Sequence, residues 1–186
     1  VAVKYDAVAR TLHWLMAALL ILMFLFGIQL EDLSLADRRE ALPMHASMGL
    51  LLLVLVLARL AWRRGHPPPP YPDGMSRRQQ RAARAVVHVF YMLMIYQPIV
   101  GLLQAASYVD FEVMAFGVWN LTALLPSDQG LKAVFNQMHG TGGWLLAVLV
   151  IGHVGATLKH WLFDRDEIPA RMIPFLKPPS DPPPSA

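Results

Sequence analysis

Residues 139–153 of the chain read HGTGGWLLAVLVIGH, with a histidine at each end of an uncharged and largely apolar stretch. An α-helix rises about 1.5 Å per residue, so the step from His139 to His153 spans about 21 Å and leaves both side chains on nearly the same face. Two ionisable side chains separated by most of a bilayer core serve two sites rather than one. The stretch therefore predicts a membrane-spanning helix that contributes one histidine to each of two sites.

Three further stretches also lack charge over the length of a membrane span. The four uncharged runs are residues 11–30, 41–58, 85–109 and 133–158. A spanning helix needs about 20 mostly apolar residues, and segments such as LLLVLVLARL (51–60) lack the polar stripe of a helix in a soluble protein. The sequence therefore predicts an all-α fold, an integral membrane four-helix bundle with helices at residues 11–30, 43–62, 83–107 and 135–162.

Composition narrows the chemistry that this bundle can carry. Of the 186 residues, 55% are apolar and only 16% are charged, whereas about 25% are charged in an average soluble domain. Cysteine is absent, which excludes disulfides, iron–sulfur clusters, thiolate zinc sites and thioether-linked c-type haem. A metal or haem must therefore be held by histidine, methionine or oxygen ligands.

The distribution of basic residues predicts the orientation of the bundle. With the N-terminus in the cytoplasm, 13 of the 16 Lys and Arg residues fall on the inner side, and the outer segments hold only Arg38, Arg39 and Lys132 beside seven acidic residues. Cytoplasmic segments of membrane proteins carry such an excess. We therefore expect a multi-pass protein of the bacterial inner membrane with both termini cytoplasmic. Its basic surface would contact lipid headgroups and not nucleic acid.

One membrane domain is expected to cover residues 1–176, followed by a disordered Pro-rich tail over residues 177–186. The first apolar run exceeds the usual signal-peptide core of about 7–15 residues, so we expect a retained helix. Residues 66–72 predict a stiff polyproline connector on the inner side. The aromatic residues of segment 110–132 indicate a position at the outer membrane–water interface.

Histidines at matching depths are candidate partners for the two on the fourth helix. His45 begins the second helix on the outer side, as His139 begins the fourth, and His13 lies towards the inner side, as His153 does. A single zinc centre would need its ligands around one point, whereas a haem iron takes two axial ligands that different helices can supply. We therefore predict two b-type haems, an inner one held by His13 and His153 and an outer one held by His45 and His139.

Other residues keep alternative interpretations. His88 fits a hydrogen bond between helices better than a ligand, and His160 at the inner edge fits an interfacial residue or a contact to quinone or a haem propionate. The three outer cations, Arg38, Arg39 and Lys132, are either ordinary surface charge or an anion-attracting patch. Small residues near the histidines would admit a porphyrin or simply pack the helices; they include Gly49, Gly140, Gly142, Gly143, Gly152 and Gly155.

Several short motifs occur in the order of a known family. They are Leu12-His13-Trp14, Met44-His45 with Gly49, Pro98-x-x-Gly101, Ala115-Phe116-Gly117, His139 with His153, and His160 with Phe163-x-x-Asp166. With these motifs, residues 3–176 resemble the bacterial cytochrome b561 family, a four-helix group that also includes hydrogenase-type b cytochromes. The spacing of the histidine pair is the most specific of these features.

The resemblance implies the same haem pairing, ubiquinone as a substrate and a role in electron transport of the respiratory chain. Small stand-alone members are similar to superoxide:ubiquinone oxidoreductases, in which superoxide would give up its electron at the outer haem and the inner haem would pass it to quinone. Arg38 and Lys132 would then steer superoxide, and His160 would contact quinone. Lys159 stands where some relatives carry another histidine.

Two other function classes compete with this enzyme. The chain could be an electron-transfer cytochrome b subunit that links a hydrogenase, a dehydrogenase or a soluble donor protein to the quinone pool, alone or as a homo-oligomer. The short outer loops show no evident docking domain for such a donor. A membrane metal transporter is disfavoured, because the four histidines lie at two depths with no acidic path between them.

Overall fold

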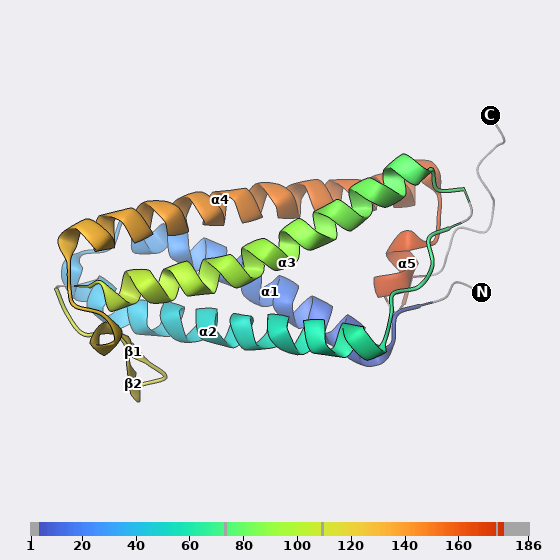
Figure 1. Ribbon diagram of the computed structural model, residues 1–186. Coiled ribbons are helices and arrows are strands. Elements are labelled where there is room, and N and C mark those ends of the chain that lie inside the picture. The colour runs from blue at the N-terminus through green and yellow to red at the C-terminus, as the bar shows by residue number, and fades with distance from the viewer. Residues whose placement is uncertain (1–3, 73, 109, 174, 177–186) are drawn as a thin grey trace.

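Four long helices dominate the computed structural model, which describes residues 4–72, 74–108, 110–173 and 175–176 (Figure 1). Their bounds are Ala7–Leu30 for α1, Leu35–Gly65 for α2, Arg77–Ala106 for α3 and Gln129–Lys159 for α4. All four are long and apolar enough to cross a membrane. The predicted all-α membrane bundle is thereby confirmed. The predicted tail over residues 177–186 lies outside the described residues.

Each helix begins before the uncharged run that predicted it, because a polar side chain caps its first turn. Asp6 accepts a hydrogen bond from the backbone N–H of Ala9, and Asp128 accepts one from that of Leu131, at 2.8 and 2.9 Å. Ser34 caps α2 in the same way, and Ser76 forms a reciprocal capping box with Gln79 at the start of α3. Such caps satisfy backbone donors that the helix itself leaves free. The fourth helix consequently starts at residue 129 and not at residue 135.

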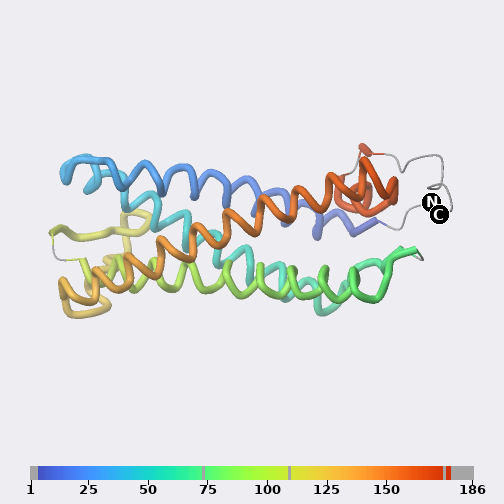
Figure 2. The backbone as a smooth tube through the Cα atoms, turned by 90° about the horizontal axis from the view of Figure 1, so that it is seen from above, coloured from blue at the N-terminus to red at the C-terminus, as the bar shows by residue number. Residues whose placement is uncertain are grey.

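The four helices run side by side along the bundle, as the view from above shows (Figure 2). Successive helices pack against one another, α1 with α2, α2 with α3 and α3 with α4. After α4, a π-helical turn, η2 (His160–Asp164), leads into the short helix α5 (Ile168–Met172). The backbone N–H of Tyr5 donates to the carbonyl of Arg171, 3.2 Å away. The segments before α1 and after α4 therefore meet at one end of the bundle. This is expected because the chain passes along the bundle four times, an even number.

The centre of the bundle is an apolar layer contributed by all four helices. Its buried members are Met16, Leu52, Val56, Met94 and Leu146. The outward faces are equally apolar: the side chains of Ile151 and Val148 are 72% and 65% exposed. A helix that is apolar on every face is stable in lipid and not in water. The surface thus supports a membrane location independently of helix length.

The end of the bundle that the sequence predicts to be the outer one, and that is called outer below, is closed by the segment between α3 and α4. It contains a two-residue-per-strand hairpin, β1 (Met114–Ala115) with β2 (Trp119–Asn120), followed by the 3₁₀ turn η1 (Leu121–Leu124). Val113 and Ala115 are fully buried in a second apolar cluster with Tyr108 and Leu121. By contrast, Phe116 and Trp119, which also belong to the hairpin, are more than half exposed. The interfacial location predicted for this segment stays a prediction.

Candidate functional site

Two pairs of histidine side chains face each other between helices; His13, His45 and His139 are half-buried, and His153 is exposed. The ring centres of His13 (α1) and His153 (α4) are 6.3 Å apart, and those of His45 (α2) and His139 (α4) are 6.0 Å apart. The planes of the two rings in each pair are steeply inclined, by 67° and 79° respectively. The structure thus brings together the same partners that depth along the helices suggested.

These separations fit a metal held between two imidazoles. With metal–nitrogen bonds of about 2.0–2.1 Å, two rings on opposite sides of one metal have centres about 6 Å apart. The buried Nδ1 atoms of His45 and His139 have no hydrogen-bond partner among the described residues. Leaving a buried polar atom unsatisfied costs about 1–3 kcal/mol. The two outer imidazoles are thus held in place at some cost in stability, and their facing separation is the observation that fits a haem iron between them.

A cavity of about 350 Å³ surrounds the outer pair, lined by residues of all four long helices. Two glycines form part of its wall directly against the rings. A Cβ on Gly101 would lie 2.9 Å from His139 Cε1, and one on Gly27 would lie 3.3 Å from His45 Cε1. The contact at Gly101 would force the His139 ring to shift, and the contact at Gly27 would require the His45 ring to give by a few tenths of an ångström. The mostly apolar lining with few polar groups is typical of a cofactor site.

Only some of the glycines singled out in the sequence lie in crowded places. A Cβ on Gly142 would overlap the side chain of Gln97, whereas Gly140, Gly152 and Gly155 have open space around the corresponding position. Gly27 was missed, since nothing in the sequence relates it to His45. Gly101 stood out only as part of a family motif, and the structure supplies its physical reason.

Gln97 is a second residue that sequence reasoning missed. Its Nε2 donates to the backbone carbonyl of His139 at 2.9 Å, and its buried Oε1 has no hydrogen-bond partner in the described part of the chain. The residue lines the outer cavity. Gln97 could have been recognised as a polar residue next to Pro98 within an uncharged run, because polar side chains in a spanning helix often have a functional role.

The inner pair lies beyond the central apolar layer. His13 stands near Trp14 of its own helix, at 5.3 Å between ring centres, and His153 stands near Phe90 of α3, at 5.4 Å. Met16, one turn after His13, already belongs to the apolar layer. The packed apolar layer thus lies between the two pairs.

The three outer cations have different surroundings. Arg38 lines the cavity of the outer pair and donates to the backbone carbonyl of Glu31 at 2.9 Å. Lys132 forms an ion pair with Asp110 and lies 4.2 Å from the ring centre of Tyr108. Arg39 is exposed. Of the three, Arg38 alone is a cavity-lining residue, and the charge of Lys132 is offset by its partner.

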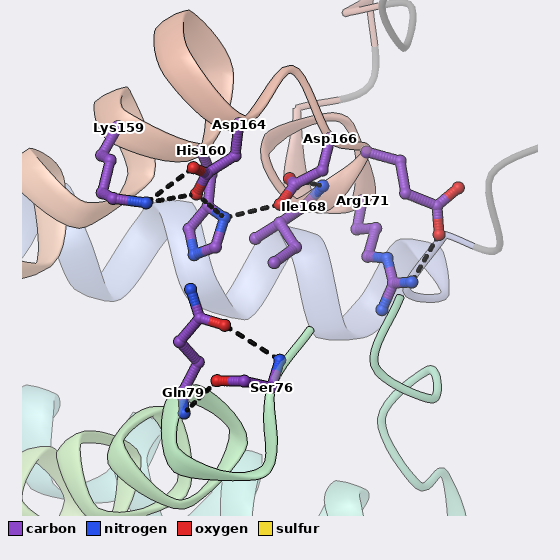
Figure 3. A network of polar contacts seen from close by, with 9 residues as sticks. Ser76, Gln79, Lys159, His160, Asp164, Asp166, Ile168 and Arg171 are labelled. Atoms are coloured by element: carbon purple, nitrogen blue, oxygen red, sulfur yellow. Dashed lines mark hydrogen bonds and ion pairs between the residues drawn. The ribbon is translucent and has the colours of Figure 1, made fainter. Parts of the chain in front are cut away.

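Two further histidines, His88 and His160, make polar contacts with residues outside the two pairs. His88 is exposed, and its Nδ1 lies 2.7 Å from the carbonyl of Arg84 in its own helix rather than bonding to another helix. His160 starts the π-helical turn, where its Nδ1 lies 2.6 Å from Asp166 and 3.1 Å from Asp164 (Figure 3). Lys159 binds both oxygens of Asp164 at 2.6 Å. The predicted contacts of His160 to quinone or propionate stay predictions.

Comparison with known proteins identifies the family. The family described as "Prokaryotic cytochrome b561" matches residues 4–175. Cytochrome b561 homolog 2 of Escherichia coli (strain K12) is 32% identical over 174 residues, which cover 91% of each chain, and Cytochrome b561 homolog 1 of the same strain is 25% identical over 72% of this chain and 74% of its own. Together with four helices able to span a membrane, this match shows that the chain belongs to the prokaryotic cytochrome b561 family, a family of multi-pass membrane cytochromes.

Proposed function

We propose that the protein binds two b-type haems and moves electrons across the inner membrane to quinone, with superoxide as the electron donor. The observation that carries the proposal is the pair of facing imidazoles at each of two depths, with ring centres 6.0 and 6.3 Å apart. Both pairs draw one member from α4, and an apolar layer separates them. This arrangement supports one haem near each membrane face.

The histidines would supply the axial ligands, His45 and His139 at the outer site and His13 and His153 at the inner site. A bound haem supplies one-electron redox chemistry at each position. The apolar layer between the pairs keeps water and protons away from the path of the electron. Gly27 and Gly101 set how closely the outer rings approach the neighbouring helices.

Arg38 supports superoxide as the donor. Its side chain lines the outer cavity together with His45, so its charge can raise the local concentration of a small anion there. The overall reaction takes two superoxide ions, one quinone and two protons, and yields two O₂ and one quinol. Each superoxide loses one electron, and the quinone gains both. Lys132 is a weaker steering candidate because Asp110 pairs with it.

His160 is the residue proposed to meet quinone at the inner end. Its ring is only 16% exposed, and Asp166 and Asp164 both lie within ion-pair distance of Nδ1 (Figure 3). Such carboxylates fix the orientation of an imidazole ring. A quinone that gains two electrons needs two protons, and this histidine would pass one of them from the cytoplasmic side.

The second candidate function is an electron-transfer subunit that receives electrons from a hydrogenase or dehydrogenase. The exposed hairpin at the outer end favours it, because Phe116, Val118 and Trp119 are 51%, 68% and 61% exposed there. Exposed apolar residues of this kind mark protein or membrane contacts. A donor protein docked at the hairpin would lie beside the outer pair, since the backbone N–H of Phe116 donates to Ser47, two residues after His45.

One set of measurements separates these functions. Purified protein should contain two haems per chain with b-type bands in the reduced-minus-oxidised spectrum. Superoxide should then reduce the haems and, with added ubiquinone, form quinol at a rate that falls as salt is added. One haem or none per chain refutes the central proposal. Two haems without superoxide-dependent quinol formation leave the electron-transfer subunit as the function.

A further inference from the structure

Arg59 ties three helices together at the inner end of the bundle. It lies in α2, and its side chain is half-buried. One guanidinium nitrogen, Nη1, donates to the backbone carbonyl of Ala9 in α1, and Nε donates to the hydroxyl of Tyr91 in α3 at 3.2 Å. In the sequence, this residue stands out only as one of the inner basic charges.

The contact with Ala9 connects Arg59 to the inner histidine pair. In an α-helix the carbonyl of residue 9 belongs to the same turn as the backbone N–H of residue 13. Arg59 is therefore hydrogen-bonded to the turn of α1 that leads to His13.

The charge of Arg59 has no counter-ion in the part of the chain that the structure describes. Both of its hydrogen-bond partners, a carbonyl and a hydroxyl, are neutral. The ion pairs found among the described residues involve Lys132, Lys159, His160 and Arg171 instead. A cation beside the apolar part of a membrane is costly, and one without a carboxylate partner is a candidate for an electrostatic role.

We propose that Arg59 is a positioning residue that fixes a positive charge beside the His13–His153 pair and thereby raises the reduction potential of the haem held there. This inference rests on the proposed function, because it requires a haem at the inner pair. Reduction adds a negative charge at the iron, so a nearby cation stabilises the reduced form. The effect is strong where the surroundings are poorly polarisable, as they are next to the apolar layer.

The consequence concerns the direction of electron flow. An electron that enters at the outer pair moves to the inner pair more readily when the inner haem holds it more tightly. Arg59 would therefore favour the reduced state of the haem from which quinone takes its electrons. The two hydrogen bonds keep the guanidinium in one place, so its influence on the potential is constant rather than averaged over many side-chain positions.

The test is a redox titration of the two haems, followed by their absorbance, in the complete haem-loaded protein. Arg59→Met removes the charge and retains an apolar stem of similar length. We expect one haem to shift towards lower potential by about tenfold in its one-electron equilibrium constant, which corresponds to 59 mV, while the other stays unchanged. Arg59→Lys keeps the charge and should restore most of the potential, even if its single ammonium cannot reproduce both hydrogen bonds.

Two matched controls separate charge from structure. Tyr91→Phe removes one hydrogen bond of Arg59 and leaves the charge, so the potentials should not move. Arg64→Met removes an exposed cation from the last turn of the same helix, and the potentials should again not move. A shift in either control as large as that in Arg59→Met would overturn the proposal.

Unchanged potentials in a two-haem Arg59→Met protein would also overturn it. If Arg59→Met does not bind the inner haem, Tyr91→Glu is titrated in its place, because a carboxylate beside Arg59 neutralises the charge without removing the side chain. An unchanged potential in that variant contradicts the proposal just as directly. Failure of the proposed function looks different, since the unmutated protein would then lack two b-type haems.

Discussion

Gly101 of α3 and His139 of α4 meet so closely that a single added carbon would strike the imidazole. A Cβ on Gly101 would lie 2.9 Å from His139 Cε1 and 3.2 Å from Nδ1. The backbone of His139 is held by the same helix, because Gln97, one turn earlier in α3, donates a hydrogen bond to the carbonyl of His139. One turn of α3 therefore determines where this imidazole stands in the outer cavity.

Gly101→Val should displace the imidazole of His139. Because the branched side chain would overlap the ring, we expect loss of the outer haem and destabilisation of about 1–3 kcal/mol, the usual range for overpacking a tight site. Haem content per chain and the thermal midpoint measure the two effects. Gly65→Ala is the matched control, since a Cβ there meets nothing within 4 Å. A Gly101→Val protein with two haems and an unaltered spectrum would contradict the proposed role of this contact.

His45→Ala and His139→Ala should each remove the same haem and spare the other. His13→Ala and His153→Ala should do the converse, because each pair shares one site. The reduced-minus-oxidised spectrum of each variant, recorded with haem content, makes the assignment. His88→Ala serves as control, since the Nδ1 of this exposed side chain lies 2.7 Å from the carbonyl of Arg84 in its own helix. Loss of different haems from His45→Ala and His139→Ala would refute the pairing.

Arg38→Ala should slow the reaction with superoxide more than Lys132→Ala does. Arg38 lines the cavity of the outer pair, whereas the charge of Lys132 is offset by Asp110. We expect a decrease of about tenfold in the rate constant for haem reduction by superoxide at low salt, and a weaker dependence of that rate on salt. Stopped-flow absorbance gives the rate, and exposed Arg39→Ala is the control. Equal effects of Arg38→Ala and Arg39→Ala would rule out a specific role for the cavity-lining cation.

Asp166→Asn should separate haem reduction from quinol formation. The carboxylate of Asp166 lies 2.6 Å from His160 Nδ1 and also accepts the backbone N–H of Ile168 at 2.9 Å, so it holds both the ring and the turn. We expect superoxide to reduce the haems as before while quinol forms at least about tenfold more slowly, a part of the roughly 10²–10⁴-fold of a general acid–base group, because Asp166 acts through His160. Glu167→Gln is the control from the same turn, because Glu167 pairs with Arg171 and not with His160. An equal loss of both activities would mean that Asp166 acts through stability alone.

Asp6 predicts an effect of acid on the inner end of the bundle. It precedes α1, and the backbone N–H of Ala9 lowers the pKa of its carboxyl below the ordinary value, with a smaller lowering from the indole of Trp62. A lowered pKa in the folded state means that the stabilisation is present above about pH 4 and is lost as the carboxyl protonates at lower pH. The thermal midpoint of the protein should fall in that acidic range. Asp6→Ala should show a lower midpoint at pH 7 and no further loss from this group in acid, and an unchanged acid response would contradict the assignment.

Sequence alone could predict the parts of this protein that depend on one helix at a time. The distance between His139 and His153 and their common face follow from helical geometry, so the depth and direction of both side chains could be predicted from their spacing. The four apolar stretches followed equally from the absence of charge. The predicted starts of α1 and α4 are too late because Asp6 and Asp128 lie among polar residues outside the apolar runs, where their capping role shows only in three dimensions.

Features that depend on contact between helices could not be predicted in the same way. Gly27 and His45 are far apart in the sequence, and no periodic pattern relates them. The same holds for Gln97 with His139, for Arg59 with Ala9 and for Lys132 with Asp110. Lys132 illustrates this limit. The sequence shows it only as one of three outer cations, like Arg38, and does not show that Asp110 pairs with it.

Because His139 and His153 lie on one uninterrupted helix, insertions and deletions between them are tightly constrained. Adding or deleting one residue between them would rotate one imidazole by about 100° relative to the other and move it by about 1.5 Å. Only one site could then keep its partner. Because both imidazoles must stay on one face of α4, the distance between the two proposed haem sites can be changed only by about one helical turn, 5.4 Å, at a time, or by replacing both partners at one end together.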